Sequence, residues 1–143
     1  MKYGIYYAYW EKEWNGDYKY YIDKISKLGF DILEISCGAF SDYYTKDQEL
    51  IDIGKYAKEK GVTLTAGYGP HFNESLSSSE PNTQKQAISF WKETLRKLKL
   101  MDIHIVGGAL YGYWPVDYSK PFDKKRDLEN SIKNMKIISQ YAE

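Results

Sequence analysis

Few side chains capable of acid–base or metal chemistry occur where an α/β protein would place its active site. Glu34 lies near the end of one apolar run, and Asp42 and Asp117 lie in later loops. His71 follows another run and is expected to be exposed or structural, whereas His104 lies inside a run and is expected to be packed and hydrogen-bonded. Catalysis by proton transfer or by a bound metal needs several carboxylates or imidazoles at one point. These residues therefore predict no self-sufficient catalytic centre.

Aromatic side chains and glycines are concentrated in the stretch GGALYGYWPVDYSKP, residues 107–121. Glycine lets a ligand approach the backbone closely, and flat rings offer an apolar wall to the C–H face of a sugar. This combination suits a pocket for a polyol. The residue types leave a second explanation open, in which the glycines serve tight turns and the rings cover one end of a barrel.

The composition excludes several classes of protein. The 143 residues amount to one domain, and Lys+Arg 20 balance Asp+Glu 20, so no charge excess favours nucleic acid or an anionic membrane surface as a partner. The single cysteine, Cys37, excludes an internal disulfide and a multi-cysteine zinc site, and we expect it to be a small buried hydrophobe. No segment resembles a signal peptide or a membrane span, so we expect a cytoplasmic protein.

Short apolar runs alternate with segments of helical period. The runs, expected to be strands, cover residues 3–9, 30–36, 62–67 and 103–108, and the helical segments cover residues 17–28, 45–61, 82–98 and 124–142. Successive β-α pairs of this length are typical of parallel strands joined by right-handed crossovers. A small doubly wound sheet and part of a (β/α) barrel both fit, and both bind ligands at the carboxyl ends of their strands.

Particular residues mark the ends and faces of the helical segments. Gly29 stands where a helix C-cap belongs, and a capping box begins at Thr45. The last segment carries the apolar residues Leu128, Ile132 and Met135 at helical spacing. No Gly-x-Gly-x-x-Gly or phosphate-loop pattern follows a run, which argues against a nucleotide site.

Several segments together resemble one known family. GIYYAYWEKEW, KLGFDILEIS, TLTAGYGP and above all DIHIVGGALYGYWPVDYSKP are similar to the D-tagatose/D-psicose (D-allulose) 3-epimerases, which are ketose 3-epimerases with xylose-isomerase-like TIM barrels. The resemblance implies that residues 1–143 are the N-terminal half of an eight-stranded barrel, a (β/α)4 half of a TIM barrel without a second domain.

The resemblance also implies the chemistry of the whole enzyme. Family members hold a divalent metal, Mn²⁺, Co²⁺ or Mg²⁺, through two Glu, an Asp and a His, and epimerise free ketohexoses at C3 through a cis-enediolate. These residues belong to the second half of the family's barrel. The chain is therefore expected to supply no catalytic residue and no metal ligand, to bind no metal alone, and to be inactive alone.

Part of the substrate wall carries over residue by residue. Six positions match the family's sugar pocket or its surroundings: Tyr6, Trp14, Glu34, Gly67, Ala109 and Trp114. Tyr6 and Trp114 match residues that line the pocket, and Gly67 and Ala109 match positions that leave room for the ketose. Trp14 matches an aromatic residue near the pocket mouth. Glu34 matches an acidic residue beside the site.

The expected partners follow from the same half-barrel. Its first and fourth strands would be unpaired edges, so we expect pairing with a C-terminal half-barrel or self-association, besides binding of a ketohexose. One alternative is a non-catalytic sugar-binding or self-associating module. Another is a complete small doubly wound protein that neither binds ketoses nor assembles.

Overall fold

The computed structural model describes residues 1–14, 16–38, 40, 44, 46–119 and 122–142, so the positions of Asp42 and Thr45 lie outside the described residues. The strands are β1 (Gly4–Tyr6), β2 (Ile32–Ser36), β3 (Thr63–Tyr68) and β4 (Val106–Gly108). The α-helices are α1 (Tyr18–Leu28), α3 (Asp47–Glu59), α4 (Pro81–Leu100) and α5 (Lys124–Ala142), and two 3-10 helices are η1 (Tyr7–Trp10) and η2 (Phe72–Glu74).

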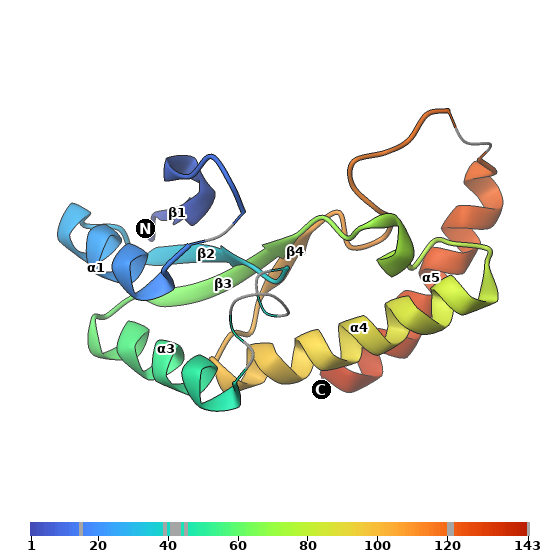
Figure 1. The fold of residues 1–143 in the computed structure, drawn as a ribbon. Coiled ribbons are helices and arrows are strands. Elements are labelled where there is room, and N and C mark those ends of the chain that lie inside the picture. Colours follow the sequence, from blue (N-terminus) through green and yellow to red (C-terminus); the bar gives the residue numbers. More distant parts are fainter. Residues whose placement is uncertain (15, 39, 41–43, 45, 120–121, 143) are drawn as a thin grey trace. The chain divides into compact units, whose positions relative to one another are not determined.

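The strands form a four-stranded sheet in the order β1-β2-β3-β4, which is also their order along the chain (Figure 1). β2 pairs in parallel with β1 and with β3, and the register sets Tyr6 opposite Glu34 and Ser36 opposite Gly67. An α-helix follows each strand along the chain: α1 follows β1, α3 follows β2, α4 follows β3 and α5 follows β4. The predicted β-α order and the parallel pairing are therefore confirmed.

The chain divides into two compact units, the first made of residues 1–67 and 96–106 and the second of residues 68–95 and 107–143. In the first unit, α1 packs against β2 and α3. The Tyr7 and Tyr18 side chains are fully buried there, with ring centroids 5.3 Å apart. Asp17 begins α1 by accepting hydrogen bonds from backbone N–H groups of the first turn, and Gly29 ends it at a φ of 81°, as predicted.

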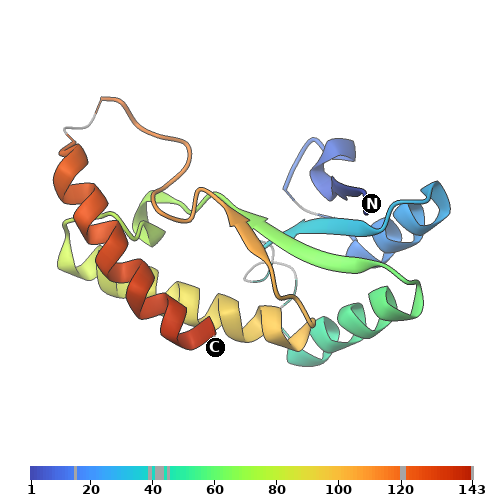
Figure 2. The ribbon, with the colours of Figure 1, turned by 180° about the vertical axis from the view of Figure 1, so that it is seen from behind.

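In the second unit, the part of α4 within it runs beside α5, as both views of the ribbon show (Figures 1 and 2). Trp91 of α4 and Ile138 of α5 are buried, and Leu76 from the preceding loop is fully buried. The Lys92 ammonium lies 4.0 Å from the centroid of the Tyr141 ring, a cation–π contact between the two helices.

The predicted last helix is confirmed as α5, but the apolar residues that it carries are not fully buried. Leu128 and Ile132 are 59% and 48% exposed, and Met135 is half-buried. The helix instead turns a partly polar face inward, where the amide of the buried Asn134 donates a hydrogen bond of 2.8 Å to the carbonyl of Leu76. Because buried backbone carbonyls need donors, Asn134 satisfies the Leu76 carbonyl from the inward face of α5.

Two strands are shorter than predicted. β1 ends at Tyr6, where the chain enters η1, and β4 covers three residues only, Val106–Gly108. The prediction that His104 lies packed inside a strand is wrong, because its side chain is 82% exposed and its Nε2 lies 2.9 Å from Oδ1 of Asp102. Asp102 has a left-handed φ of 59°, so the chain turns sharply just before this segment and β4 begins later.

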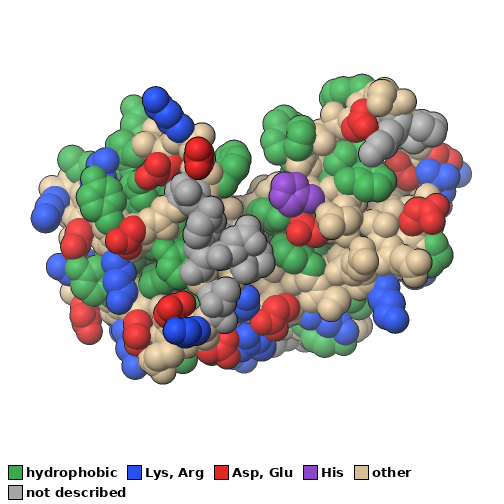
Figure 3. All heavy atoms as spheres, viewed as in Figure 1, with side chains coloured by type: hydrophobic (Ala, Val, Ile, Leu, Met, Phe, Trp, Pro, Cys, Tyr) green, Lys and Arg blue, Asp and Glu red, His purple; other side chains and the backbone are tan. Residues whose placement is uncertain are grey.

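The surface carries both signs of charge. Over the face drawn in Figure 3, side chains of Lys and Arg are interspersed with those of Asp and Glu, and hydrophobic side chains lie among them. This mixture agrees with the zero formal net charge of the sequence. Among the described residues, no helix combines the length and the apolar character needed to cross a membrane.

Candidate functional site

The carboxyl ends of β1, β2 and β3 bring four of the predicted site residues together in the first unit. Tyr6 ends β1 and stands opposite Glu34 of β2. The ring of Trp14, from the loop after η1, has its centroid 6.1 Å from that of Tyr6, at an interplanar angle of 41°. Gly67 of β3 is the fourth member, because it touches Glu34.

Gly67 makes room for the Glu34 carboxylate. A Cβ atom at position 67 would lie 2.7 Å from Oε1 and 3.2 Å from Cδ of Glu34. Real Cβ atoms do not approach an oxygen so closely, so the absence of a side chain at Gly67 is what allows Glu34 to lie across β3. The carboxylate is thereby placed beside the Tyr6 phenol, at the end of the sheet where parallel α/β proteins bind ligands.

Tyr6 is held as a neutral phenol. Partial burial raises its pKa above the ordinary value of 10.0, and electrostatic interactions with Glu34 and Cys37 add to the increase. A side-chain hydrogen bond with Ser36 opposes these effects but does not cancel them. A neutral phenol keeps its O–H group and so can donate a hydrogen bond to a hydroxyl or a carbonyl oxygen.

The loop that carries Trp14 is fastened by two tyrosines that the sequence reading did not single out. The Tyr7 hydroxyl donates a 2.7 Å hydrogen bond to the backbone carbonyl of Trp14. The Tyr44 hydroxyl donates a 2.8 Å hydrogen bond to the carbonyl of Gly16 and accepts one from the backbone N–H of Tyr18. The only signal for such contacts in the sequence is the high tyrosine content of 15 residues, which does not say where they are.

The other two predicted site residues, Ala109 and Trp114, belong to the second unit, after β4. The backbone N–H of Ala109 donates to the carbonyl of Tyr68 at 3.1 Å. The N–H of Trp114 donates to the carbonyl of Pro70 at 2.7 Å, and the Trp114–Pro115 peptide bond is cis. The indole of Trp114 is 61% exposed, so it is available to a ligand.

The segment of residues 69–74 holds the Trp114 backbone through the Pro70 carbonyl. The Glu74 carboxylate accepts a 2.7 Å hydrogen bond from the Tyr68 hydroxyl and a 2.8 Å hydrogen bond from the backbone N–H of His71. These two hydrogen bonds stabilise the turn that contains Pro70, whose carbonyl accepts the Trp114 N–H. Glu74 was not predicted from the sequence. The prediction of an exposed or structural His71 is confirmed by its exposed position.

A divalent metal does not fit the described residues. Nowhere in the described part of the chain do three or more His, Cys, Asp or Glu side chains form a group that could hold a metal ion. The cluster in the first unit offers Glu34 together with phenol and indole groups, and a hard cation requires several oxygen ligands.

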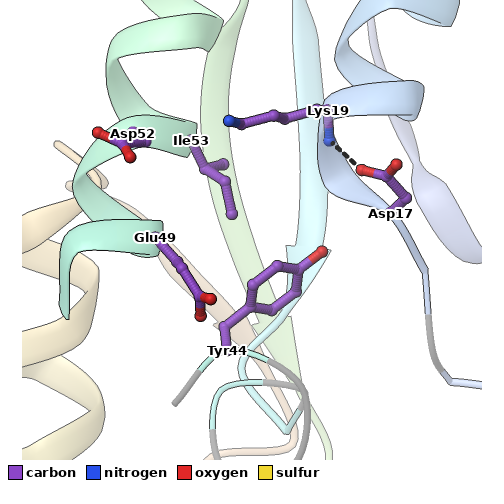
Figure 4. Close-up of a pocket in the computed structure, with 6 residues that line it drawn as sticks. All are labelled: Asp17, Lys19, Tyr44, Glu49, Asp52 and Ile53. Atoms are coloured by element: carbon purple, nitrogen blue, oxygen red, sulfur yellow. Dashed lines mark hydrogen bonds between the residues drawn. The ribbon is translucent and has the colours of Figure 1, made fainter. Parts of the chain in front are cut away.

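A separate cavity of about 220 Å³ lies in the first unit, between the starts of α1 and α3 (Figure 4). Its lining consists of Asp17, Lys19, Tyr44, Glu49, Asp52 and Ile53. Asp17 already accepts the backbone N–H of Lys19, the bond drawn in Figure 4, and caps α1. None of these side chains coincides with a predicted site residue, so this cavity is distinct from the cluster around Tyr6.

Relatives of the chain point to one enzyme family, although no protein-family model matches it. Curated D-psicose 3-epimerases from Enterocloster bolteae and Ruminiclostridium cellulolyticum are 55% and 48% identical to it over 143 residues. A third, from Agrobacterium fabrum, is 43% identical over 142 residues. These alignments take in 99–100% of this chain and 48% of each relative, so the chain spans about half the length of the curated relatives it matches.

Solved structures of ketose 3-epimerases share the fold of this chain. A crystal structure of D-psicose 3-epimerase with D-tagatose from Clostridium cellulolyticum H10 matches with a TM-score of 0.95 and 46% identity, over 99% of this chain and 48% of that chain. An L-ribulose 3-epimerase matches with a TM-score of 0.82 at 15% identity, over 99% of this chain and 46% of that chain, which speaks for the fold alone. The chain is therefore an α/β protein with the fold of half a TIM barrel, and it is homologous to the N-terminal half of the D-psicose 3-epimerases, the ketose 3-epimerase family that its sequence resembles.

Proposed function

We propose that the chain supplies part of the substrate wall of a ketose 3-epimerase that acts on D-psicose. The observation that carries the proposal is the match of the whole chain to D-psicose 3-epimerases at 43–55% identity. The cluster of Tyr6, Trp14, Glu34 and Gly67 at the carboxyl ends of three strands supports it, because its chemistry suits a sugar. Residues 1–143 then act as the N-terminal half of a (β/α) barrel.

Within this proposal the residues of the chain bind and orient the sugar. The rings of Tyr6 and Trp14 face its C–H groups and keep water away from them, and the neutral Tyr6 phenol donates to a sugar oxygen. Glu34 accepts a hydrogen bond from a sugar hydroxyl. In the second unit, Trp114 and Ala109 are proposed as further contacts for a ketose.

The metal and the carboxylates that move the C3 proton are proposed to belong to a second half-barrel. When bound, a divalent metal polarises the ketose carbonyl and so acidifies the neighbouring C–H group. The described residues contain no group of side chains suited to it. We propose that the chain binds no metal by itself and is inactive by itself. We also propose that it lies in the cytoplasm, where a lone buried thiol such as Cys37 stays reduced.

Complementation tests the proposal directly. The chain is mixed, with Mn²⁺ present, with the separately expressed part of the Enterocloster bolteae enzyme that it does not match, and conversion of D-psicose to D-fructose is followed. We expect turnover from the mixture and none from either piece. An assembled mixture without turnover contradicts the proposal, and so does Mn²⁺-dependent turnover by the chain alone.

A substitution in the same mixture separates substrate binding from metal binding. Trp114→Ala removes an exposed ring and no carboxylate or imidazole, so we expect KM for D-psicose to rise while the Mn²⁺ concentration for half-maximal activity stays the same. The reverse pattern excludes Trp114 from the substrate wall.

A further inference from the structure

In the loop that carries Trp14, residues 11–14 and 16–17 belong to no helix or strand. The loop lies between η1 and α1, and the Trp14 side chain is 65% exposed. A loop held only by its ends would leave such a ring in many orientations, and ordering it would cost binding free energy. What fixes the loop therefore decides how well the ring can receive a ligand.

Tyr7 reaches this loop from inside the core. Its side chain is fully buried, with ring centroids at 5.3 Å from Tyr18 and 5.7 Å from Tyr21. From this fixed position its hydroxyl donates the 2.7 Å hydrogen bond to the Trp14 carbonyl. Burial raises the pKa of the Tyr7 phenol well above its ordinary value, so the donor proton is present at every physiological pH.

Gly16 fastens the other side of the loop. A Cβ atom at position 16 would lie 3.0 Å from the ring of Tyr21 and 3.1 Å from the ring of Tyr7, so the backbone lies directly on the buried tyrosines. The Tyr44 hydroxyl donates to the Gly16 carbonyl at 2.8 Å. The carbonyls of Trp14 and Gly16 are thus each held by a tyrosine hydroxyl.

We infer that Tyr7 is a positioning residue for ketose binding, which acts by holding the Trp14 backbone so that the indole faces the Tyr6 ring. The inference rests on the proposed function, since the orientation of Trp14 matters only if the ring meets a substrate. With the carbonyl anchored, the indole retains only its side-chain rotations. The ring centroid of Trp14 then lies 6.1 Å from that of Tyr6, an arrangement that exists before the sugar arrives.

The test replaces Tyr7 by Phe, which keeps the buried ring and removes the one hydroxyl. The matched control is Tyr56→Phe, which removes a 2.8 Å hydrogen bond to Asp23 between α3 and α1, away from the loop. Both proteins are labelled with 5-fluorotryptophan, and the ¹⁹F resonance of Trp14 is assigned with Trp14→Phe. We expect Tyr7→Phe to shift or broaden that resonance without sugar, and Tyr56→Phe to leave it unchanged.

The second arm measures D-psicose epimerisation by the complemented mixture described above. Since one hydrogen bond contributes about 0.5–1.5 kcal/mol, Tyr7→Phe should raise KM roughly 2- to 10-fold with kcat nearly unchanged. Gly16→Ala, which presses on the same rings and leaves the phenol intact, should act in the same direction even if Tyr7→Phe folds poorly. A Trp14 resonance and a KM that match those of the control overturn the inference.

The two proposals fail in different ways. If the original chain gives turnover in the mixture and Tyr7→Phe has the same KM, the positioning role is wrong and the proposed function stands. If Trp14→Phe itself leaves KM unchanged, Trp14 is not part of the wall, and the inference falls with that assignment.

Discussion

One backbone hydrogen bond anchors each of the two exposed tryptophans, Trp14 and Trp114. Trp14 is held through its carbonyl by Tyr7, and Trp114 through its N–H by the Pro70 carbonyl. Each also lies beside a glycine: Gly16 follows in the loop of Trp14, and a Cβ atom at Gly69 would lie 2.9 Å from Cβ of Trp114. These hydrogen bonds and glycine contacts anchor the backbone at two exposed indoles, which suits a flat apolar wall.

Alanine at the two contact glycines should have unequal effects on stability. At Gly67 the clash falls on the flexible end of Glu34, so Gly67→Ala should change the free energy of unfolding by less than about 1 kcal/mol. At Gly69 it falls on Cβ of Trp114, so Gly69→Ala should cost about 1–3 kcal/mol. Urea unfolding measures both, and Gly112→Ala, where an added Cβ meets nothing within 4 Å, is the control. Equal costs at positions 67 and 69 contradict this account.

Cys37 is predicted to be inert in the folded chain. Its side chain is buried, and burial raises the pKa of the thiol from 9.0 to about 12. Because the thiolate is the reactive form, alkylation by iodoacetamide at pH 8 should be on the order of a thousandfold slower than for an unfolded cysteine. Mass spectrometry with and without urea measures the two rates. Similar rates would mean that Cys37 is accessible in the folded state.

At the scale of elements, α1 and α3 begin differently. Asp17 accepts backbone N–H groups of the first turn of α1, whereas Lys46 precedes α3 without a side-chain cap. Asp17→Ala should therefore destabilise the chain by about 1 kcal/mol, because first-turn donors lose their acceptor. Lys46→Ala should be nearly neutral. Urea unfolding of the two variants checks the contrast, which fails if both lose the same stability.

The helices were predictable from the sequence because their signals are local. Gly29 caps α1 as its position indicates, and α5 covers the residues expected for it. The inward face of α5 was not predictable, since Asn134 donates a hydrogen bond to a carbonyl 58 residues away in sequence. The exposed His104 has a similar origin, because the left-handed Asp102 redirects a segment whose apolar pattern is that of a strand.

The site was predictable to the extent that strand ends position it. Tyr6, Glu34 and Gly67 meet because parallel strands place their carboxyl ends at one edge, and that rule needs only the order of elements. Tyr7 and Glu74 act on backbone groups, and a hydrogen bond to a carbonyl or an N–H leaves no spacing pattern. The supports of a site are therefore harder to read from sequence than its lining.

At the scale of the whole molecule, the sheet has β1 and β4 at the ends of its strand order. Edge strands of this kind offer unpaired backbone N–H and C=O groups to another chain. The exposed Leu128 and Ile132 of α5 add apolar surface in the second unit. A second half-barrel is proposed to cover this surface.

Replacing both residues tests that proposal. Leu128→Ser with Ile132→Ser should leave the stability of the isolated chain nearly unchanged, because both side chains are about half exposed or more. It should weaken assembly with the second half at least about tenfold, as lost apolar contact of this size predicts. Light scattering of the mixtures measures it, with Leu28→Ser at an exposed site of α1 as control. Unchanged assembly excludes this face from the interface.

The agreement between strand order and chain order has a consequence for synthesis. Each strand finds its neighbour already made, since β2 docks on β1 and β3 on β2. A polypeptide leaving the ribosome can thus extend the sheet step by step, without keeping an early strand waiting for a distant partner.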